Sequence, residues 1–157
     1  LRIKDDVQRL LEISLVLFYT GQSRKSKLII EDQIKNVKTN SNESIFLLND
    51  IKKDAIKMKE TLLLGKLDEF SNILNYSWHR KKNLAKSISN QSLDEIYSNA
   101  LKNGAKSGKI TGAGGGGFFM FYVDPCSRIK LIKYLSKLEG NILNFQFINQ
   151  GSLSWRY

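Results

Sequence analysis

The sequence predicts an α+β fold, in which helices cover one face of a small β-sheet. Residues 13–19 and 118–123 are short runs of β-branched, aromatic and aliphatic side chains, as buried strands require. Between them, residues 26–103 are dominated by apolar side chains at helical spacing. Because strands and helices do not alternate along the chain, a doubly wound parallel fold is excluded.

Four helices are expected between the first two strands. The second begins at Ser41 or Asn42 and stops at Gly65, since glycine often follows the last helical turn. The fourth begins with the capping-box pattern that runs from Ser92 to Glu95. The other expected helical ranges are 26–37 and 67–87, and the fourth helix ends at 103. The apolar residues expected to face the core from the second helix are Ile45, Leu48, Ile51, Ala55, Met58 and Leu62.

The chain after the second apolar run predicts one more helix and a hairpin. The helix begins at Asp124-Pro125, because proline is favoured at the first helical position. A strand over 142–148, a turn at 149–151 and a final strand over 152–157 then form the hairpin. The residues expected to point inward from the helix are Ile129, Ile132, Leu135 and Leu138.

Charge and composition limit the classes of function. The chain carries 25 lysine and arginine residues against 15 aspartate and glutamate residues, a formal net charge of +10. This balance favours nucleic acid, a membrane surface or phosphorylated metabolites as partners, although generic solvated lysines would give the same count. No apolar run approaches the roughly 18 residues of a membrane span. The lone Cys126 excludes an intrachain disulfide and a multi-cysteine zinc site, and no metal ligand is assigned.

The ends of the chain also carry information. Its length is typical of one domain, so residues 1–157 are treated as a single domain. Residue 1 is leucine and no signal-peptide pattern follows, so we expect a fragment or a processed product.

A glycine run is the most specific feature of the sequence. Its backbone N–H groups could form an anion-binding concavity, and glycine lets the backbone approach a ligand closely. A Rossmann fingerprint would need a following helix, and a Walker A loop would need Lys-Ser/Thr after Gly117. A bulge or flexible hairpin loop is the alternative. The expected phosphate- or substrate-binding residues are Gly112, Ala113, Gly114, Gly115, Gly116 and Gly117.

Residues 109–118, from Lys109 to Phe118, resemble the third conserved motif of the GHMP sugar kinases, which lies in their C-terminal domain. Residues 17–24, 78–84 and 96–109 resemble one branch of that superfamily, the D-glycero-D-manno-heptose 7-phosphate kinases. The resemblance therefore covers nearly the whole chain.

The resemblance implies a ferredoxin-like antiparallel sheet with several helices packed on one side. It implies that a missing N-terminal domain binds most of the ATP and Mg²⁺ and carries any catalytic acid. No catalytic residue is then expected on this fragment, which would be inactive alone. The implied partners are ATP, a sugar phosphate and that N-terminal domain, without a membrane, in the cytoplasm.

The implied function of the intact protein is phosphorylation of the anomeric hydroxyl of the heptose 7-phosphate. Alternatives are a GHMP kinase for another sugar or alcohol, and a basic nucleic-acid-binding domain without catalysis. Nucleic acid is the less favoured partner, because the aromatic residues fall in apolar runs and not among Lys and Arg.

The substrate implied by the resemblance carries a phosphate, so a second anion site is expected. Trp78 and Lys82 are four residues apart on a predicted helix, and Lys81 is within the same turn. Arg24 follows a strand and precedes a helix N-terminus, where anions bind. Each has a structural alternative: a core tryptophan, solvated lysines and a surface-turn arginine.

Overall fold

The computed structural model describes residues 2–22, 26–39, 41–148 and 150–156. Within these residues the chain forms one four-stranded sheet with the order β2-β3-β1-β4. Every neighbouring pair of strands is antiparallel, which confirms the α+β, ferredoxin-like prediction. The strands are β1 (Leu15–Tyr19), β2 (Ala105–Ile110), β3 (Phe118–Val123) and β4 (Asn141–Leu143).

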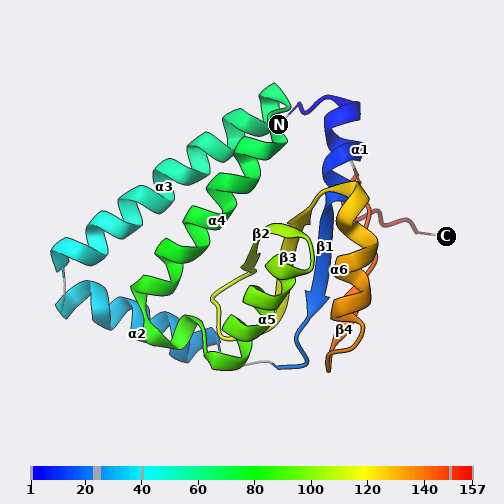
Figure 1. Cartoon of the computed structure of the whole chain (residues 1–157). Helices are drawn as coiled ribbons and strands as arrows, with labels where there is room; N and C mark the ends of the chain where they lie inside the picture. The colour runs from blue at the N-terminus through cyan, green and yellow to red at the C-terminus, as the bar shows by residue number, and fades with distance from the viewer. Residues whose placement is uncertain (1, 23–25, 40, 149, 157) are drawn as a thin grey trace.

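Helices α5 and α6 lie over one face of the sheet, and the α3–α4 hairpin lies beside the β2 edge (Figure 1). Helix α1 leads directly into β1 (Figure 1). The helices are α1 (Asp5–Ser14), α2 (Ser26–Thr39), α3 (Ser41–Leu64), α4 (Leu67–Leu84), α5 (Gln91–Lys102) and α6 (Arg128–Leu135), with 3₁₀ turns η1 (Lys86–Ile88) and η2 (Pro125–Ser127).

Alternation along the strands divides the apolar side chains between two clusters. Phe18 of β1 and Phe119 of β3 are fully buried with Trp78 in the main core, beneath α5 and α6. Leu15 and Tyr122, on the other face of the sheet, pack with α1 and the first half of α4. The main core therefore lies on the side that α5 and α6 cover, as predicted.

The inward assignment for α3 is confirmed at three positions, because Ile51, Met58 and Leu62 are partly buried against the two clusters. Ile45 and Leu48 are 47% and 41% exposed, and Ala55 is exposed too, so their inward assignment is wrong. Asp54 is buried instead of the adjacent Ala55, and its carboxylate accepts two hydrogen bonds from Arg80 Nη1 of α4, at 2.7 and 2.6 Å. That ion pair holds a polar residue against α4.

Two elements were not predicted. Helix α1 occupies residues that the sequence left unassigned or gave to the first strand. Strand β2 was missed because its sequence, Ala-Lys-Ser-Gly-Lys-Ile, lacks an apolar alternation. Its small residues are required by contacts: a Cβ on Gly108 would lie 2.4 Å from the Phe121 ring, and Ser107 hydrogen-bonds Ser71 at 2.8 Å.

Three smaller predictions need correction. Helix α4 ends at Leu84, since Ala85 is extended and lets the following η1 turn bury Ile88. Helix α5 begins one residue earlier than predicted, with Asn90 as its N-cap in place of Ser92: the Asn90 side chain accepts from Leu93 N. Ile129 is 67% exposed, so its inward assignment is also wrong.

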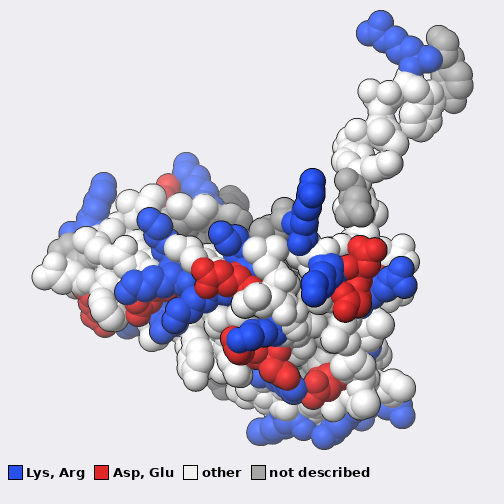
Figure 2. All heavy atoms as spheres, turned by 90° about the horizontal axis from the view of Figure 1, so that it is seen from above, with Lys and Arg blue, Asp and Glu red and all other residues white. Residues whose placement is uncertain are grey.

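The predicted C-terminal hairpin is absent from the described residues. Strand β4 ends at Leu143, and residues 144–148 and 150–156 form no strand; Asn149 and Tyr157 lie outside the described part. The Phe147 N–H donates to Glu12 Oε2 at 2.8 Å, so the segment follows α1 and does not pair back on itself. Beyond this contact the tail stands away from the body (Figure 2).

Acidic and basic side chains are interleaved on the face that Figure 2 shows. Several lysines are neutralised locally; for example, Lys106 contacts both Asp68 at 2.8 Å and Asp124 at 3.0 Å. No helix in the described ranges combines the length and apolarity needed to cross a membrane.

The Asp54–Arg80 pair generates a stability prediction. Replacing Arg80 by Met leaves a buried carboxylate without its counter-charge, and we expect a loss of about 2 kcal/mol, below the usual cost for a buried pair because Arg80 is partly exposed. Urea unfolding measures the loss. Lys27→Met, at an exposed pair with Glu31, is the matched control and should change stability by less than about 0.5 kcal/mol. Equal effects of the two substitutions would contradict the assignment.

Candidate functional site

The glycine loop, residues 112–117, connects β2 to β3 at the end of the sheet where β1 also ends. The Thr20 N–H donates to the Gly117 carbonyl at 2.9 Å, and the Thr20 hydroxyl donates to the same oxygen at 3.0 Å. Gln33 of α2 donates to the Ala113 carbonyl at 3.3 Å. The loop is therefore held between the end of β1 and helix α2.

Close approach explains why glycine is needed at two of these positions. Gly116 has φ +138°, and a Cβ there would lie 2.6 Å from the Gln22 carbonyl oxygen. Gly114 has φ +114°, and its Cβ would lie 2.9 Å from the Ile88 carbonyl oxygen. Any other residue would combine an unfavourable backbone conformation with a steric clash.

Two loop N–H groups are already used inside the domain. Gly115 N donates to the Ile88 carbonyl and Gly117 N donates to the Gln22 carbonyl, both at 2.7 Å. These two groups are consequently committed to the fold and are not offered to a ligand. Anion binding by the remaining loop N–H groups stays a prediction.

Lys81, near the end of α4, reaches the first residue of the loop. Its ammonium group donates a hydrogen bond to the Gly112 carbonyl. Burial, followed by the positive charge of Lys109, lowers the pKa of Lys81 to about 8. Lys81 is thus a half-buried cation whose charge is only partly stabilised by its surroundings.

Lys109 is a site residue that was quoted in the sequence motif but not assigned a role. It lies in β2 opposite Met120 of β3, and burial lowers its pKa while the Asp54 carboxylate opposes that shift. In the described part of the chain, neither Lys81 nor Lys109 is within salt-bridge distance of a carboxylate. We call these two residues the cation pair. Their arrangement can attract an anion, which would relieve their mutual repulsion.

The other predicted phosphate ligands are placed differently. Lys82 contacts Asp94 at 2.9 Å and lies over the Trp78 and Tyr97 rings, 5.8 and 5.9 Å from their centroids. Trp78 itself is fully buried in the main core, so its structural alternative describes it better than a ligand role. Arg24 lies outside the described residues. Of the four candidates, the structure brings only Lys81 to the glycine loop among the residues it describes.

The described residues include no group of three or more Asp, Glu, His or Cys side chains that could hold a metal ion. We therefore assign no Mg²⁺ ligand to these residues and derive no step through the metal.

The chain is similar to proteins of known family. The sequence profile of the family "GHMP kinases C terminal" matches residues 58–138. The chain is 42% identical over 156 residues to the D-glycero-alpha-D-manno-heptose 7-phosphate kinase of Campylobacter jejuni, a match that covers 99% of this chain and 45% of that protein. It is 28% identical over 127 residues to the L-fucokinase/L-fucose-1-P guanylyltransferase of Bacteroides fragilis, covering 80% of this chain and 13% of that protein.

A solved structure gives the same relationship. The crystal structure of a D-glycero-D-manno-heptose 1-phosphate kinase from Bacteroides thetaiotaomicron superposes with a TM-score of 0.66 at 29% identity, covering 100% of this chain and 40% of that one. The chain thus spans less than half the length of each of these three proteins.

The glycine loop generates a second prediction. Gly116→Ala should lower the free energy of unfolding by about 2 kcal/mol more than Gly112→Ala does. Its thermal unfolding temperature should therefore be clearly the lower of the two. Both positions have positive φ, but a Cβ at Gly112 meets nothing within 4 Å, whereas at Gly116 it meets the Gln22 carbonyl. Similar unfolding temperatures for the two variants would show that the loop is not held against Gln22.

Proposed function

Because the chain belongs to the family of GHMP kinase C-terminal domains, we propose that the intact protein is an ATP-dependent kinase for a sugar phosphate. The acceptor we propose is D-glycero-D-manno-heptose 7-phosphate, phosphorylated at its anomeric hydroxyl. The observation that carries the proposal is the cation pair beside the glycine loop. The 42% identity to a heptose 7-phosphate kinase supports the choice of acceptor.

Phosphoryl transfer depends on positioning and on charge neutralisation. In the proposed mechanism, Lys81 and Lys109 neutralise a phosphate of the bound reactants and so hold it at a fixed distance from the glycine loop. The ammonium groups act as point charges, which suits a phosphate whose orientation is set elsewhere. The left-handed glycines keep the loop backbone free of side chains where the acceptor approaches.

The remaining parts of the site are assigned to an N-terminal domain of the same protein. Relatives are more than twice as long as this chain, which supports such a domain. We expect it to supply the loop around the ATP phosphates, the Mg²⁺ ligands and any catalytic acid. The chain alone is then expected to be inactive. Because the reaction consumes ATP, we expect the protein to act in the cytoplasm.

A neutral sugar is the second candidate acceptor, favoured by the similarity to a fucokinase. The two candidates differ in whether the acceptor carries a phosphate for the cation pair. The test incubates the full-length protein and Mg-ATP with the heptose 7-phosphate or with L-fucose, and detects the new phosphate by ³¹P NMR. Turnover of fucose but not of the heptose phosphate would overturn the proposed acceptor.

Lys81→Met should raise the KM for the sugar phosphate about ten- to a hundredfold, because a charge-assisted contact is worth about 1.5–3 kcal/mol. The KM for ATP should change far less. Lys86→Met, an exposed lysine just beyond α4, is the control and should leave both constants unchanged. A larger effect on the KM for ATP would show that the cation pair contacts the nucleotide and not the sugar phosphate.

The lowered pKa of Lys81 predicts a pH dependence. Lys81 is protonated below about pH 8 and loses its charge as the pH rises through that value. Since kcat/KM reports groups of the free enzyme, kcat/KM for the sugar phosphate should fall between pH 7 and 9. Lys81→Arg keeps its charge throughout and should flatten the profile. An unchanged fall in that variant would assign the titration to another group.

A further inference from the structure

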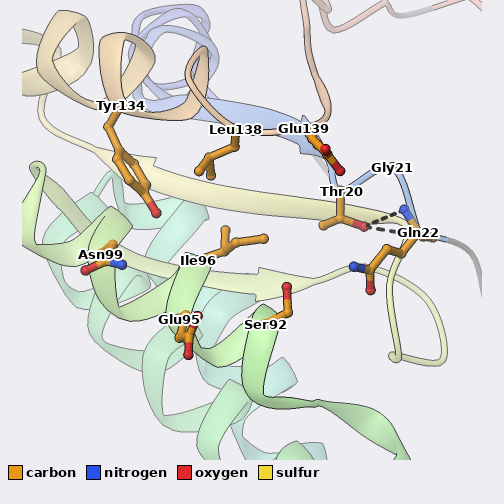
Figure 3. Close-up of a pocket in the computed structure, with 10 residues that line it drawn as sticks. All are labelled: Thr20, Gly21, Gln22, Ser92, Glu95, Ile96, Asn99, Tyr134, Leu138 and Glu139. Carbon is orange, nitrogen blue, oxygen red and sulfur yellow. Dashed lines mark hydrogen bonds between the residues drawn. The ribbon is translucent and has the colours of Figure 1, made fainter.

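A pocket of about 290 Å³ lies between α5, the end of α6 and the residues that follow β1 (Figure 3). We call it the α5–α6 pocket. The aliphatic side chains of Ile96 and Leu138 point toward each other across it, and the hydroxyl groups of Ser92 and Tyr134 point into it from two sides (Figure 3). The lining thus combines an apolar centre with a polar rim, which is the usual composition of a small-molecule site.

The rim is rich in uncharged hydrogen-bonding groups and in carboxylates. Burial raises the pKa of the Tyr134 phenol, and a side-chain hydrogen bond with Asn99 opposes that shift. Asn99 offers an amide, and Glu139 contributes a carboxylate that only accepts hydrogen bonds. Glu95 adds a second carboxylate to the lining. The two carboxylates disfavour a phosphate and can accept hydrogen bonds from a ligand with several hydroxyl groups.

The pocket shares a wall with the glycine loop. Thr20 and Gln22 line the pocket, and the same two residues hold Gly117: Thr20 donates to its carbonyl and Gln22 accepts from its N–H. The cation pair is not part of the lining. A ligand in the pocket would therefore contact residues that hold the glycine loop, without lining residues from the cation pair.

We propose that the α5–α6 pocket binds a neutral monosaccharide and that its occupancy is sensed by the glycine loop. A pyranose ring offers C–H groups that match Ile96 and Leu138, and hydroxyl groups that can donate to Glu139 and Asn99. An ammonium ligand would satisfy the carboxylate but not the apolar centre. A phosphorylated sugar would place its charge beside the Glu139 carboxylate.

The experiment titrates the ¹⁵N-labelled chain with D-mannose and follows backbone amide chemical shifts. Saturable shifts are expected at Asn99 and Glu139 in the pocket, and at Gly116 and Gly117 in the loop. D-Mannose 6-phosphate should shift the pocket amides at least tenfold more weakly at equal concentration. Putrescine, a small diamine, should leave the pocket amides unchanged.

Ser92→Arg places a bulky cation at the pocket rim, on an exposed position of α5. It should abolish the mannose-dependent shifts. Ser98→Arg adds the same side chain to an exposed position of α5 outside the lining, and it should retain them. Far-ultraviolet circular dichroism identifies any variant that fails to fold, and Glu139→Lys then replaces Ser92→Arg as the blocking variant.

Three results would overturn the proposal. The first is the absence of saturable shifts with mannose. The second is pocket shifts with putrescine or with mannose 6-phosphate that equal those with mannose. The third is mannose-dependent shifts confined to Lys81 and Gly112, which would locate the sugar at the cation pair. None of these results bears on the kinase activity of the full-length protein, so the two proposals fail separately.

Discussion

The architecture around the glycine loop depends on two backbone hydrogen bonds. Gly115 and Gly117 donate to the carbonyls of Ile88 and Gln22, and these bonds join the β2–β3 connection to η1 and to the end of β1. Neighbouring glycines permit both bonds, since a Cβ at Gly114 or Gly116 would lie only 2.9 or 2.6 Å from the Ile88 or Gln22 carbonyl oxygen. The loop is consequently packed against the rest of the domain, and close packing is one reason for its glycines.

The cation pair lies beside this packed loop, since Lys81 donates to the Gly112 carbonyl. Most basic side chains with a described ion pair lie on the surface, where such pairs contribute little to stability. Lys81 and Lys109 are half-buried, and burial opposes the charge of each. Perturbed pKa values cluster at functional sites, which supports the anion-binding role that we propose for the cation pair. That proposal depends on two local charges and does not use the overall excess of +10.

The sequence predicted the order of the major elements and the glycine loop because both depend on local patterns. The two apolar strands and the long helices follow from hydrophobic periodicity, which is strong over these lengths. Strand β2 was not predicted, because its Ser107 and Gly108 are small in order to fit against Ser71 and Phe121. These two partner residues lie far from β2 or on another strand, so a local pattern does not reveal the contacts. The burial of Asp54 in α3 was not predicted for a similar reason: its carboxylate is paired with Arg80 of α4, and periodicity assigns a carboxylate to the solvent. Lys109 was not predicted as a site residue, because it comes near Lys81 only through the packing of β2 on α4.

Two groups of residues with different chemistry therefore adjoin one loop. The half-buried ammonium groups form the anion site that we propose, whereas hydroxyl, amide and carboxylate groups surround an apolar centre between α5 and α6. The Thr20–Gln22 segment contacts the loop directly and lines the second site, so no long chain of residues is needed to connect them. A change of a few tenths of an ångström at Gln22 would have to be accommodated at Gly116 and Gly117, because close-packed backbone does not deform without cost. The coupling that we propose between the sites would act through this shared wall. Its strength would be limited by the difference in ligand affinity between two positions of the wall.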